Sequence, residues 1–212
     1  KIHTFSRGGS DLTGAIVARA LSADIYENWT DVSGFLVADP RIIKDPVAID
    51  TITYRELREL SYMGASVLHE ETIFPIRELE IPIYILNTNA PTDEGTIILS
   101  ESTDNSCLIT GISGKKNYKA FTIAKTINAN KAQVIRNCLE VFESFKVAVE
   151  HIPTAIDKFN IIVDGKKVDK KLYDIIAKLK QINGVVSVEV DSDLALVAVV
   201  GRNMVLRPGM SG

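Results

Sequence analysis

Apolar residues follow two alternating spacings along the first hundred positions. A spacing of three or four residues is typical of a helix that is buried along one face, and it predicts helices over 10–21, 53–63 and 70–79. Short apolar runs bounded by polar residues predict strands, or at one place a turn, over 24–29, 34–37, 81–86 and 96–99. Strands that alternate with helices indicate an α/β layer with a largely parallel sheet.

The pattern changes after the polar stretch 100–106, which contains our candidate linker, 101–106. Amphipathic spacing predicts two helices, over 131–145 and 168–182. Strands are predicted over 108–112, 118–124, 147–152, 159–163, 185–190 and 194–200. The order strand, helix, strand, strand, helix, strand, with an extra strand at each side, is typical of the ferredoxin-like arrangement.

One helix start carries a specific local signal. Thr53 precedes the predicted helix 53–63 as its N-cap, and Glu56 follows three residues later. This is the spacing of a capping box, in which each side chain bonds the backbone of the other residue.

Composition limits the classes of function. The 212 residues are 46% hydrophobic and 24% charged, as in soluble globular proteins, and the formal net charge is −3. Acidic residues interrupt the lysines within 166–171, so a nucleic-acid partner has no electrostatic support. No apolar stretch is long enough to span a bilayer. We interpret Cys107 and Cys138 as small buried apolar residues, and we expect a cytoplasmic protein.

The segment Arg7-Gly8-Gly9-Ser10-Asp11 is the most informative candidate site. Two glycines allow the backbone to approach a ligand closely, and the helix that follows offers unpaired N–H groups to an anion. Arg7 can hold a carboxylate through two hydrogen bonds, and Asp11 can position an ammonium group or a catalytic lysine. The alternative is a structural turn before a capped helix, which is the more common use of such a segment.

Two further segments follow predicted strands. Thr30 and Asp31 end the first strand, and ligands of open α/β sheets bind beyond the carboxyl ends of strands. The turn Asp39-Pro40-Arg41 can present Arg41 to a phosphate. The alternatives are an ordinary turn after the strand and a rigid turn with a solvated arginine.

In the second half, the segment 150–157 joins two predicted strands, and Pro153 makes the connection rigid. Its carboxylates and its backbone edge can bind the ammonium and carboxylate of an amino acid. The alternative is a plain connection with solvated charges.

Other catalytic signatures are missing from the sequence. It contains no His-Cys-Asp cluster with metal-ligand spacing and no serine or cysteine triad signature. Its glycine-rich segment lacks the Gly-Lys-Ser/Thr ending of a P-loop. We interpret His69 as a hydrogen-bonded packing residue.

Taken in their order, the four candidate sites resemble segments of the aspartate kinase family. The segment 7–11 resembles the loop that contacts aspartate, and 30–31 and 39–41 resemble the nucleotide-side segment. The segment 150–157 resembles the sensing loop of an ACT unit. The matching segments are 5–14, 29–34, 38–41, 53–62, 67–69, 87–91, 95–96 and 150–157. The resemblance covers essentially the whole chain.

The resemblance implies a fold, a reaction and site residues. The fold is the C-terminal part of an amino-acid-kinase α/β sandwich followed by a ferredoxin-like ACT α+β domain. The reaction is phosphoryl transfer from ATP, with Mg²⁺, to the β-carboxylate of L-aspartate, the first step toward lysine, threonine and methionine. Aspartate-binding residues would be Arg7, Gly8, Gly9 and Ser10, with Asp11 catalytic; nucleotide-binding residues would be Thr30, Asp31, Asp39, Arg41 and Ser66; effector-binding residues would be Glu150, Pro153, Thr154, Ala155, Ile156 and Asp157.

Three departures from the family pattern qualify the resemblance. The family's N-terminal Lys-Phe-Gly-Gly-Thr-Ser segment is absent, so we expect this chain alone to be inactive as a kinase. Ser66 stands where many members have lysine. The segment 128–133 departs from the usual Met- and Gly-containing pattern, which leaves the effector's identity open.

The resemblance also implies a domain plan. We expect kinase residues at 1–100 and a regulatory region at 107–212, in which a first ACT unit at about 118–192 is inserted into an incomplete second unit. Family members pair ACT units, so we expect a homodimer. The alternative function is an amino-acid-binding ACT module that retains a non-catalytic kinase remnant.

Overall fold

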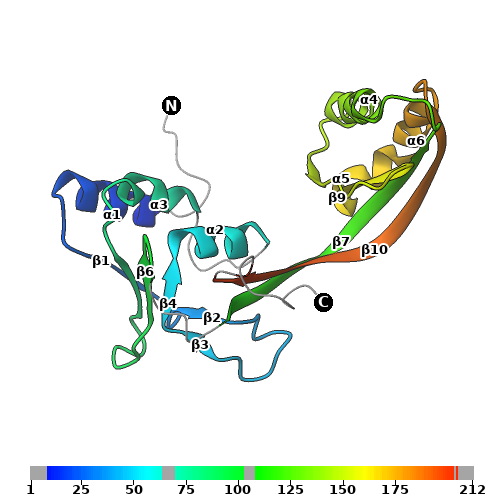
Figure 1. The fold of residues 1–212 in the computed structure, drawn as a ribbon. Helices are drawn as coiled ribbons and strands as arrows, with labels where there is room; N and C mark the ends of the chain where they lie inside the picture. The colour runs from blue at the N-terminus through cyan, green and yellow to red at the C-terminus, as the bar shows by residue number, and fades with distance from the viewer. Residues whose placement is uncertain (1–8, 64–69, 103–107, 203, 205–212) are drawn as a thin grey trace. The chain divides into compact units, whose positions relative to one another are not determined.

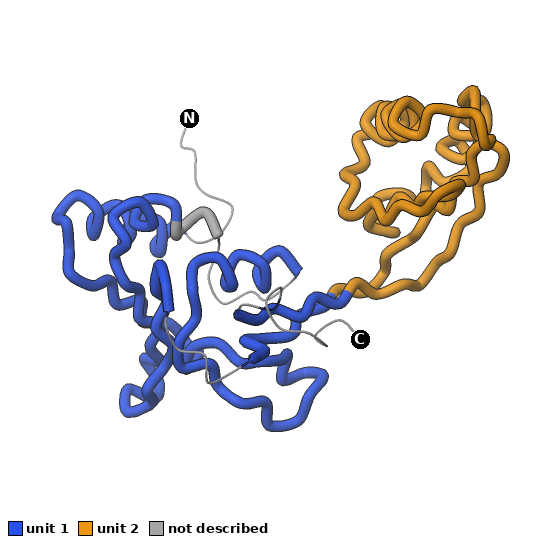
Figure 2. Tube along the Cα trace, viewed as in Figure 1, with its two compact units in different colours: residues 1–114, 197–212 blue, residues 115–196 orange. Residues whose placement is uncertain are grey.

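The structure of the chain is a computed structural model that describes residues 9–63, 70–102, 108–202 and 204 (Figure 1). The chain forms two compact units (Figure 2). Unit 1 comprises Lys1–Gly114 and Val197–Gly212, and unit 2 comprises Lys115–Leu196. Two long strands, β7 (Ile109–Lys125) and β10 (Val185–Gly201), each contribute residues to both units.

Unit 1 is built on a four-stranded sheet in the order β1-β5-β6-β4. Its strands are β1 (Tyr26–Thr30), β4 (Thr51–Thr53), β5 (Ile83–Asn87) and β6 (Thr96–Leu99). The pairs β1–β5 and β4–β6 are parallel, whereas β5–β6 is antiparallel. The parallel-rich sheet agrees with the sequence pattern, and the one antiparallel pair arises because a short connection joins β5 directly to β6.

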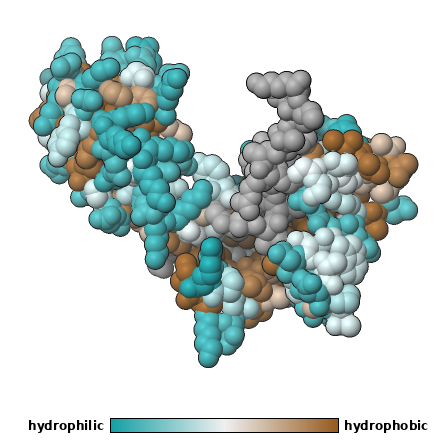
Figure 3. Space-filling view, turned by 180° about the vertical axis from the view of Figure 1, so that it is seen from behind, coloured by the Kyte–Doolittle hydropathy of each residue, from teal (hydrophilic) through white to brown (hydrophobic). Residues whose placement is uncertain are grey.

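Helices α1 (Gly9–Ala20), α2 (Tyr54–Tyr62) and α3 (Glu70–Arg77) belong to unit 1 (Figure 1). Leu57 and Leu60 of α2 are buried, and Ile52 and Ile83 contribute to the same core from the sheet. On α1, Ala15 and Ala18 face inward, while Ile16 and Val17 are exposed, as is Leu21 just after the helix. Hydrophobic surface gathers over the α1 end of unit 1 (Figure 3).

Unit 2 contains a sheet in the order β10-β7-β9-β8, with β8 (Val149–His151) and β9 (Lys158–Asp164). Strand β9 pairs antiparallel with both of its neighbours. The helices are α4 (Lys131–Ser144), α5 (Gly165–Val168), the 3₁₀ turn η1 (Asp169–Lys171) and α6 (Leu172–Lys180). Phe121 of β7 meets Phe142 of α4 edge-to-face, with ring centroids 5.1 Å apart, in the core of this unit.

The structure corrects several predicted elements. Segments 108–112 and 118–124 are parts of the single strand β7, and 185–190 and 194–200 are parts of β10. Polar residues do not interrupt these strands, because backbone pairing needs no apolar side chain. The predicted helix 168–182 is observed only over 172–180, as α6; η1 precedes it, and Val168 is the last residue of α5. The strands β3 (Ala48–Ile49) and β4 were not predicted, since they are too short to show a periodic pattern.

Candidate functional site

The first turn of α1 carries part of the predicted substrate site. Gly9 and Ser10 begin the helix, and Asp11 lies in its first turn, where a carboxylate is favoured by the helix dipole. The Ser10 hydroxyl donates to the Asp11 carboxylate, Oγ to Oδ1, over 3.3 Å, and both residues reach solvent. Arg7 and Gly8 lie outside the described residues.

Strand β1 fixes the position of this turn. The Tyr26 hydroxyl donates to the main-chain oxygen of Asp11 over 3.2 Å, and Asn28 Nδ2 donates to the same hydroxyl over 3.4 Å. A Cβ at Gly14 would lie 2.4 Å from that hydroxyl oxygen, so only glycine allows α1 to approach β1 here. Burial and the nearby Asp11 charge raise the pKa of Tyr26, which keeps it a hydrogen-bond donor.

The parallel strands β1 and β5 end at one edge of the sheet. Thr88 donates both its N–H and its hydroxyl to the Thr30 carbonyl, over 2.8 and 2.5 Å. Beyond the strand end, Ser33 donates to the Asp93 carboxylate and accepts from Asn87 Nδ2 over 2.8 Å. The loops after the two strands are therefore joined to each other, and this is the edge at which ligands of open α/β sheets bind.

The backbone after β1 turns sharply at Gly34, whose φ is +86°. A Cβ at this position would lie 2.3 Å from the Thr96 hydroxyl oxygen. Thr96 is fully buried; its hydroxyl accepts from Phe35 N over 2.8 Å and donates to the Ile49 carbonyl over 2.6 Å. These contacts anchor the segment that contains Thr30 and Asp31 to the start of β6.

Thr30 and Asp31 remain exposed to solvent or partly so. The Thr30 hydroxyl donates to Asp31 Oδ1 over 3.2 Å. Only residues 21–25 join α1 to β1, so the chain reverses and α1 begins on the side of the sheet where β1 ends (Figure 1). The structure thus brings two of the predicted segments to one side of unit 1.

Asp39 and Arg41 bind each other. Arg41 donates to both carboxylate oxygens, with Nη2 to Oδ2 at 2.7 Å and Nε to Oδ1 at 2.9 Å, and its main-chain N–H also bonds Oδ1. These hydrogen bonds lower the pKa of Asp39 to about 2. The side chain of Arg41 is 82% exposed, so the pair lies in water. Ser66, the remaining predicted nucleotide residue, lies outside the described residues, as does His69.

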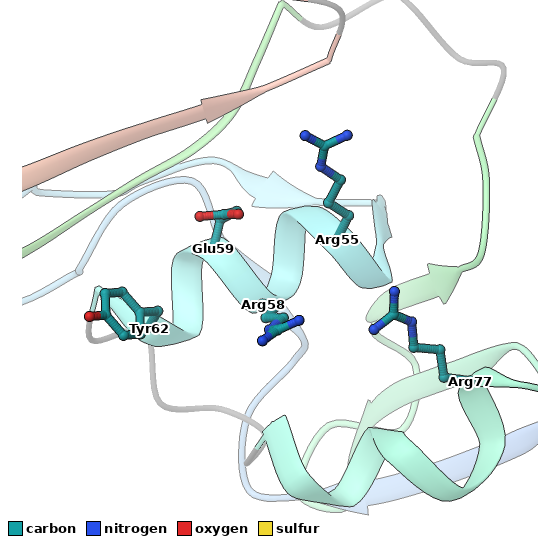
Figure 4. Close-up of a pocket in the computed structure, with 5 residues that line it drawn as sticks. All are labelled: Arg55, Arg58, Glu59, Tyr62 and Arg77. Atoms are coloured by element: carbon teal, nitrogen blue, oxygen red, sulfur yellow. The ribbon is translucent and has the colours of Figure 1, made fainter.

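The sequence did not indicate a basic cavity between α2 and α3. Its volume is about 590 Å³, and its lining consists of Arg55, Arg58, Glu59, Tyr62 and Arg77. Arg58 and Arg77 extend into the space between the two helices, whereas Arg55 extends from another side of α2 (Figure 4). The cavity was missed because its residues are brought together from two helices by the tertiary fold.

Glu56 joins several elements of unit 1. One carboxylate oxygen, Oε2, accepts from Thr53 N over 2.8 Å and from the Thr53 hydroxyl over 2.7 Å, which confirms the predicted capping box. The other, Oε1, accepts from the Thr110 hydroxyl and from Arg202 Nε at 3.1 Å. Arg202 also donates to Ser102 Oγ over 3.0 Å and to the Thr51 carbonyl over 2.6 Å.

The environment of Glu56 favours its ionised form. Burial alone raises the pKa of this carboxyl, but the hydrogen bonds from Thr110 and Thr53 and the charge of Arg202 outweigh burial and lower it. A cavity of about 780 Å³, also lined by Glu101 and Met204, borders Glu56 and Arg202.

The predicted effector segment of unit 2 is a closed turn. Thr154 bridges to Phe159, Ala155 N donates to the Lys158 carbonyl over 2.8 Å, and Lys131 Nζ donates to the Ala155 carbonyl over 2.7 Å. The Pro153 and Asp157 carbonyls accept main-chain N–H groups over 2.9 Å each. Ile156 is 85% exposed, and Glu150 lies on β8. Much of the backbone is thus engaged, while the side chains at the tip reach solvent.

Two features are absent from the part of the chain that the structure describes. None of its helices combines the length and apolar character needed to cross a membrane. Nor do three or more of its His, Cys, Asp or Glu side chains gather into a group that could hold a metal ion.

Comparison with known proteins adds the family. The amino acid kinase family model matches residues 1–87. Aspartokinase 3 of Bacillus subtilis (strain 168) is 37% identical over 204 residues, which are 96% of this chain and 45% of that protein. The chain therefore spans about half the length of the curated relatives it matches.

Solved structures agree with this result. The structure of Clostridium acetobutylicum aspartate kinase matches with a TM-score of 0.91 and 47% identity, over 99% of this chain and 49% of that one. E. coli aspartokinase III matches with a TM-score of 0.76 and 27% identity, in a complex with aspartate and ADP (98% and 47% covered) and in one with lysine and aspartate (95% and 45%). The predicted fold class, a kinase-type α/β part followed by an ACT-type α+β part, is confirmed.

Proposed function

This chain belongs to the aspartate kinase family, and we propose that it supplies the C-terminal part of an aspartate kinase domain together with an ACT regulatory region. The whole protein would transfer the γ-phosphoryl group of ATP to the β-carboxylate of L-aspartate. Kinase residues would occupy 1–100, a linker 101–106 and the regulatory region 107–212.

One observation carries the proposal: the first turn of α1 is tied to β1 by the hydrogen bond from Tyr26 to Asp11. The tie fixes the first turn of α1, with the Asp11 carboxylate, against Tyr26, the first residue of β1. Phosphoryl transfer depends on such positioning and on charge neutralisation rather than on covalent chemistry from the protein.

Roles follow from this arrangement. Arg7, Gly8, Gly9 and Ser10 would bind the carboxylates of aspartate, and Asp11 would organise its reacting end. Thr30 and Asp31 would meet the nucleotide, with Ser66 and Arg41 near its phosphates. Arg41 already binds Asp39, so a phosphate would share or replace that partner. Mg²⁺ would arrive with ATP, since this ion is usually bound by one or two carboxylates plus substrate phosphates.

We assign regulation to unit 2. E. coli aspartokinase III has been solved with lysine bound, which supports an amino-acid effector here: lysine, threonine or methionine. The binding residues would be Glu150 and the turn formed by Pro153, Thr154, Ala155, Ile156 and Asp157. Two copies of the chain would associate through their ACT units.

Thermal unfolding of residues 1–212 tests the substrate site. L-Aspartate should raise the melting temperature, because a ligand that binds only the folded state stabilises it, whereas L-asparagine, which lacks the β-carboxylate, should not. Arg7→Met should abolish the shift. Arg41→Met is the matched control: it removes an arginine from the nucleotide side and should keep the aspartate shift while weakening the shift caused by ADP.

Two results would contradict the proposal. One is an aspartate shift of equal size in Arg7→Met. The other is stabilisation by lysine, threonine or methionine with none by aspartate or ADP, which would identify a regulatory module with a non-catalytic kinase remnant. A companion assay of aspartate-dependent ADP release should show no turnover by residues 1–212 alone.

A further inference from the structure

Strands β7 and β10 both have their unit 1 ends at the start of α2. Thr110 is the second residue of β7, and Arg202 directly follows β10. Both donate to the same carboxylate oxygen of Glu56, which lies in the first turn of α2. We call these three residues, with the N-cap Thr53, the Glu56 clasp; all four belong to unit 1.

The clasp is shielded from water. The side chain of Glu56 is 7% exposed and that of Arg202 is 11% exposed. Each carboxylate oxygen of Glu56 accepts from two different groups, and Arg202 reaches the Thr51 carbonyl at the start of β4 as well. A charge this buried is stable only while its partners stay in place, so the clasp favours one arrangement of the two strand ends.

Packing around the clasp supports the same arrangement. A Cβ at Gly111 of β7 would lie 2.9 Å from a methyl carbon of Leu60 on α2, so glycine allows the strand to lie directly on the helix. Ile112 N donates to the Val37 carbonyl over 2.7 Å. Val200 of β10 is buried in the unit 1 core. Both strand ends are therefore integral parts of unit 1.

The same strands carry the core of unit 2. Phe121 lies on β7, eleven residues after Thr110, and meets Phe142 of α4. Val188 of β10 is buried in the same core. Phe121 and Val188 therefore lie on the same two strands whose other ends are held by the Glu56 clasp.

We propose that Glu56 and Arg202 are positioning residues that fasten both connecting strands to α2, so that the state of unit 2 is transmitted to the kinase part through this clasp. The transmitted change is a shift in how firmly the start of α2 is held. The coupling itself does not depend on the kinase assignment; its effect on phosphoryl transfer rests on the proposed function.

A mutant cycle read by amide hydrogen exchange tests the coupling in the 212-residue chain. Phe142→Leu loosens unit 2 at the Phe121 contact, Arg202→Met opens the clasp, and the readout is the exchange of amides 57–62 in α2. In the unmodified background, Phe142→Leu should speed this exchange by about fivefold; in the Arg202→Met background it should change it by less than about twofold.

Non-additivity separates coupling from a local structural role. If Arg202 only stabilises α2, the fold-changes that the two substitutions cause in α2 amide exchange multiply independently. That result overturns the proposal. It is overturned equally if Phe142→Leu leaves α2 exchange unchanged in the unmodified background. Arg41→Met breaks an exposed ion pair of unit 1 and serves as the control. In this background, Phe142→Leu should speed the exchange of amides 57–62 as much as it does in the unmodified chain.

Two further variants keep the test decisive if Arg202→Met fails to fold. Thr110→Val removes one hydrogen bond to Glu56 with little change in shape, and Arg202→Lys keeps the charge but loses the planar fork. In either background, Phe142→Leu should speed α2 exchange less than it does in the unmodified chain. An undiminished effect in both backgrounds would contradict the proposed role of the Glu56 clasp. In a kinase that contains this chain, the same substitutions should reduce amino-acid inhibition more than they reduce uninhibited turnover. Normal inhibition with lost exchange coupling would reject only the step to activity.

Discussion

Two of the carboxylate–guanidinium pairs in the described part of unit 1, Asp39–Arg41 and Glu56–Arg202, look alike by distance and differ in their surroundings. Arg41 and Asp39 approach to 2.7 Å and are 82% and 32% exposed. Arg202 and Glu56 approach to 3.1 Å and are 11% and 7% exposed. The shorter contact is local and solvated, and the longer one joins α2 to the end of β10.

The comparison shows that distance is a poor guide to what an ion pair contributes. Water and salt screen the Asp39–Arg41 pair, and such pairs contribute little to stability. The Glu56–Arg202 pair has lost its water and depends on its protein partners, so removal of one partner leaves a buried charge unpaired. The Glu56–Arg202 pair should therefore affect the free energy of unfolding much more than the Asp39–Arg41 pair.

The largest effect is expected for Arg202→Met. It should lower the free energy of unfolding by about 3 kcal/mol, because Glu56 keeps its charge but loses its counter-ion. Urea denaturation monitored by circular dichroism measures this. The double variant Glu56→Gln/Arg202→Met should recover part of the loss, since it removes the unpaired charge. A single variant as stable as the unmodified chain would show that water replaces the guanidinium at no cost.

Thr110→Val should have the next largest effect. It removes the hydroxyl that donates to Glu56 Oε1 and leaves the shape of the side chain nearly unchanged, so the loss should be about 1 kcal/mol. The same denaturation experiment measures it. Thr13→Val is a suitable control, since that hydroxyl bonds the Gly9 carbonyl at an exposed position of α1. Equal losses in the two variants would show that burial does not distinguish these hydroxyls.

Sequence patterns found one half of the Glu56 interactions and missed the other half. The capping box is a contact over three residues, and its spacing predicted it. The bonds from Thr110 and Arg202 cross 54 and 146 residues, and no local pattern encodes them. The Asp39–Arg41 pair spans two residues, yet its partners were interpreted separately, as a turn and a phosphate ligand.

The range of sequence over which an element's signal lies also explains which elements of the fold were predicted. Helix α2 was placed within one residue of its observed bounds, because a cap and an apolar stripe lie in adjacent residues. Strands β7 and β10 were each divided in two, since polar residues at 115–117 and 191–193 resemble turns until sheet pairing is known. The basic cavity of Arg55, Arg58 and Arg77 needs two helices to form.

Acid should reduce the stability that the buried Glu56 carboxylate contributes, and this effect is expected to be smaller than the two above. The pKa of Glu56 is lowered in the folded state, so its contribution to stability is present above the unfolded value, near 4.5, and is lost as pH falls through the folded pKa. Denaturation curves between pH 7 and 3 should therefore fall less steeply for Glu56→Gln than for the unmodified chain. Parallel curves would mean that Glu56 titrates alike in both states.

The smallest effect is expected for Arg41→Met. The pKa of Asp39 is also lowered, to about 2, but both side chains lie in water, where the lost hydrogen bonds are replaced by solvent. The melting temperature at neutral pH should stay within the error of the measurement, and NMR titration should show the Asp39 pKa returning toward 3.8. A clear loss of stability here would mean that Asp39 and Arg41 are shielded by groups beyond each other, and the contrast with Glu56 and Arg202 would have to be explained by something other than water.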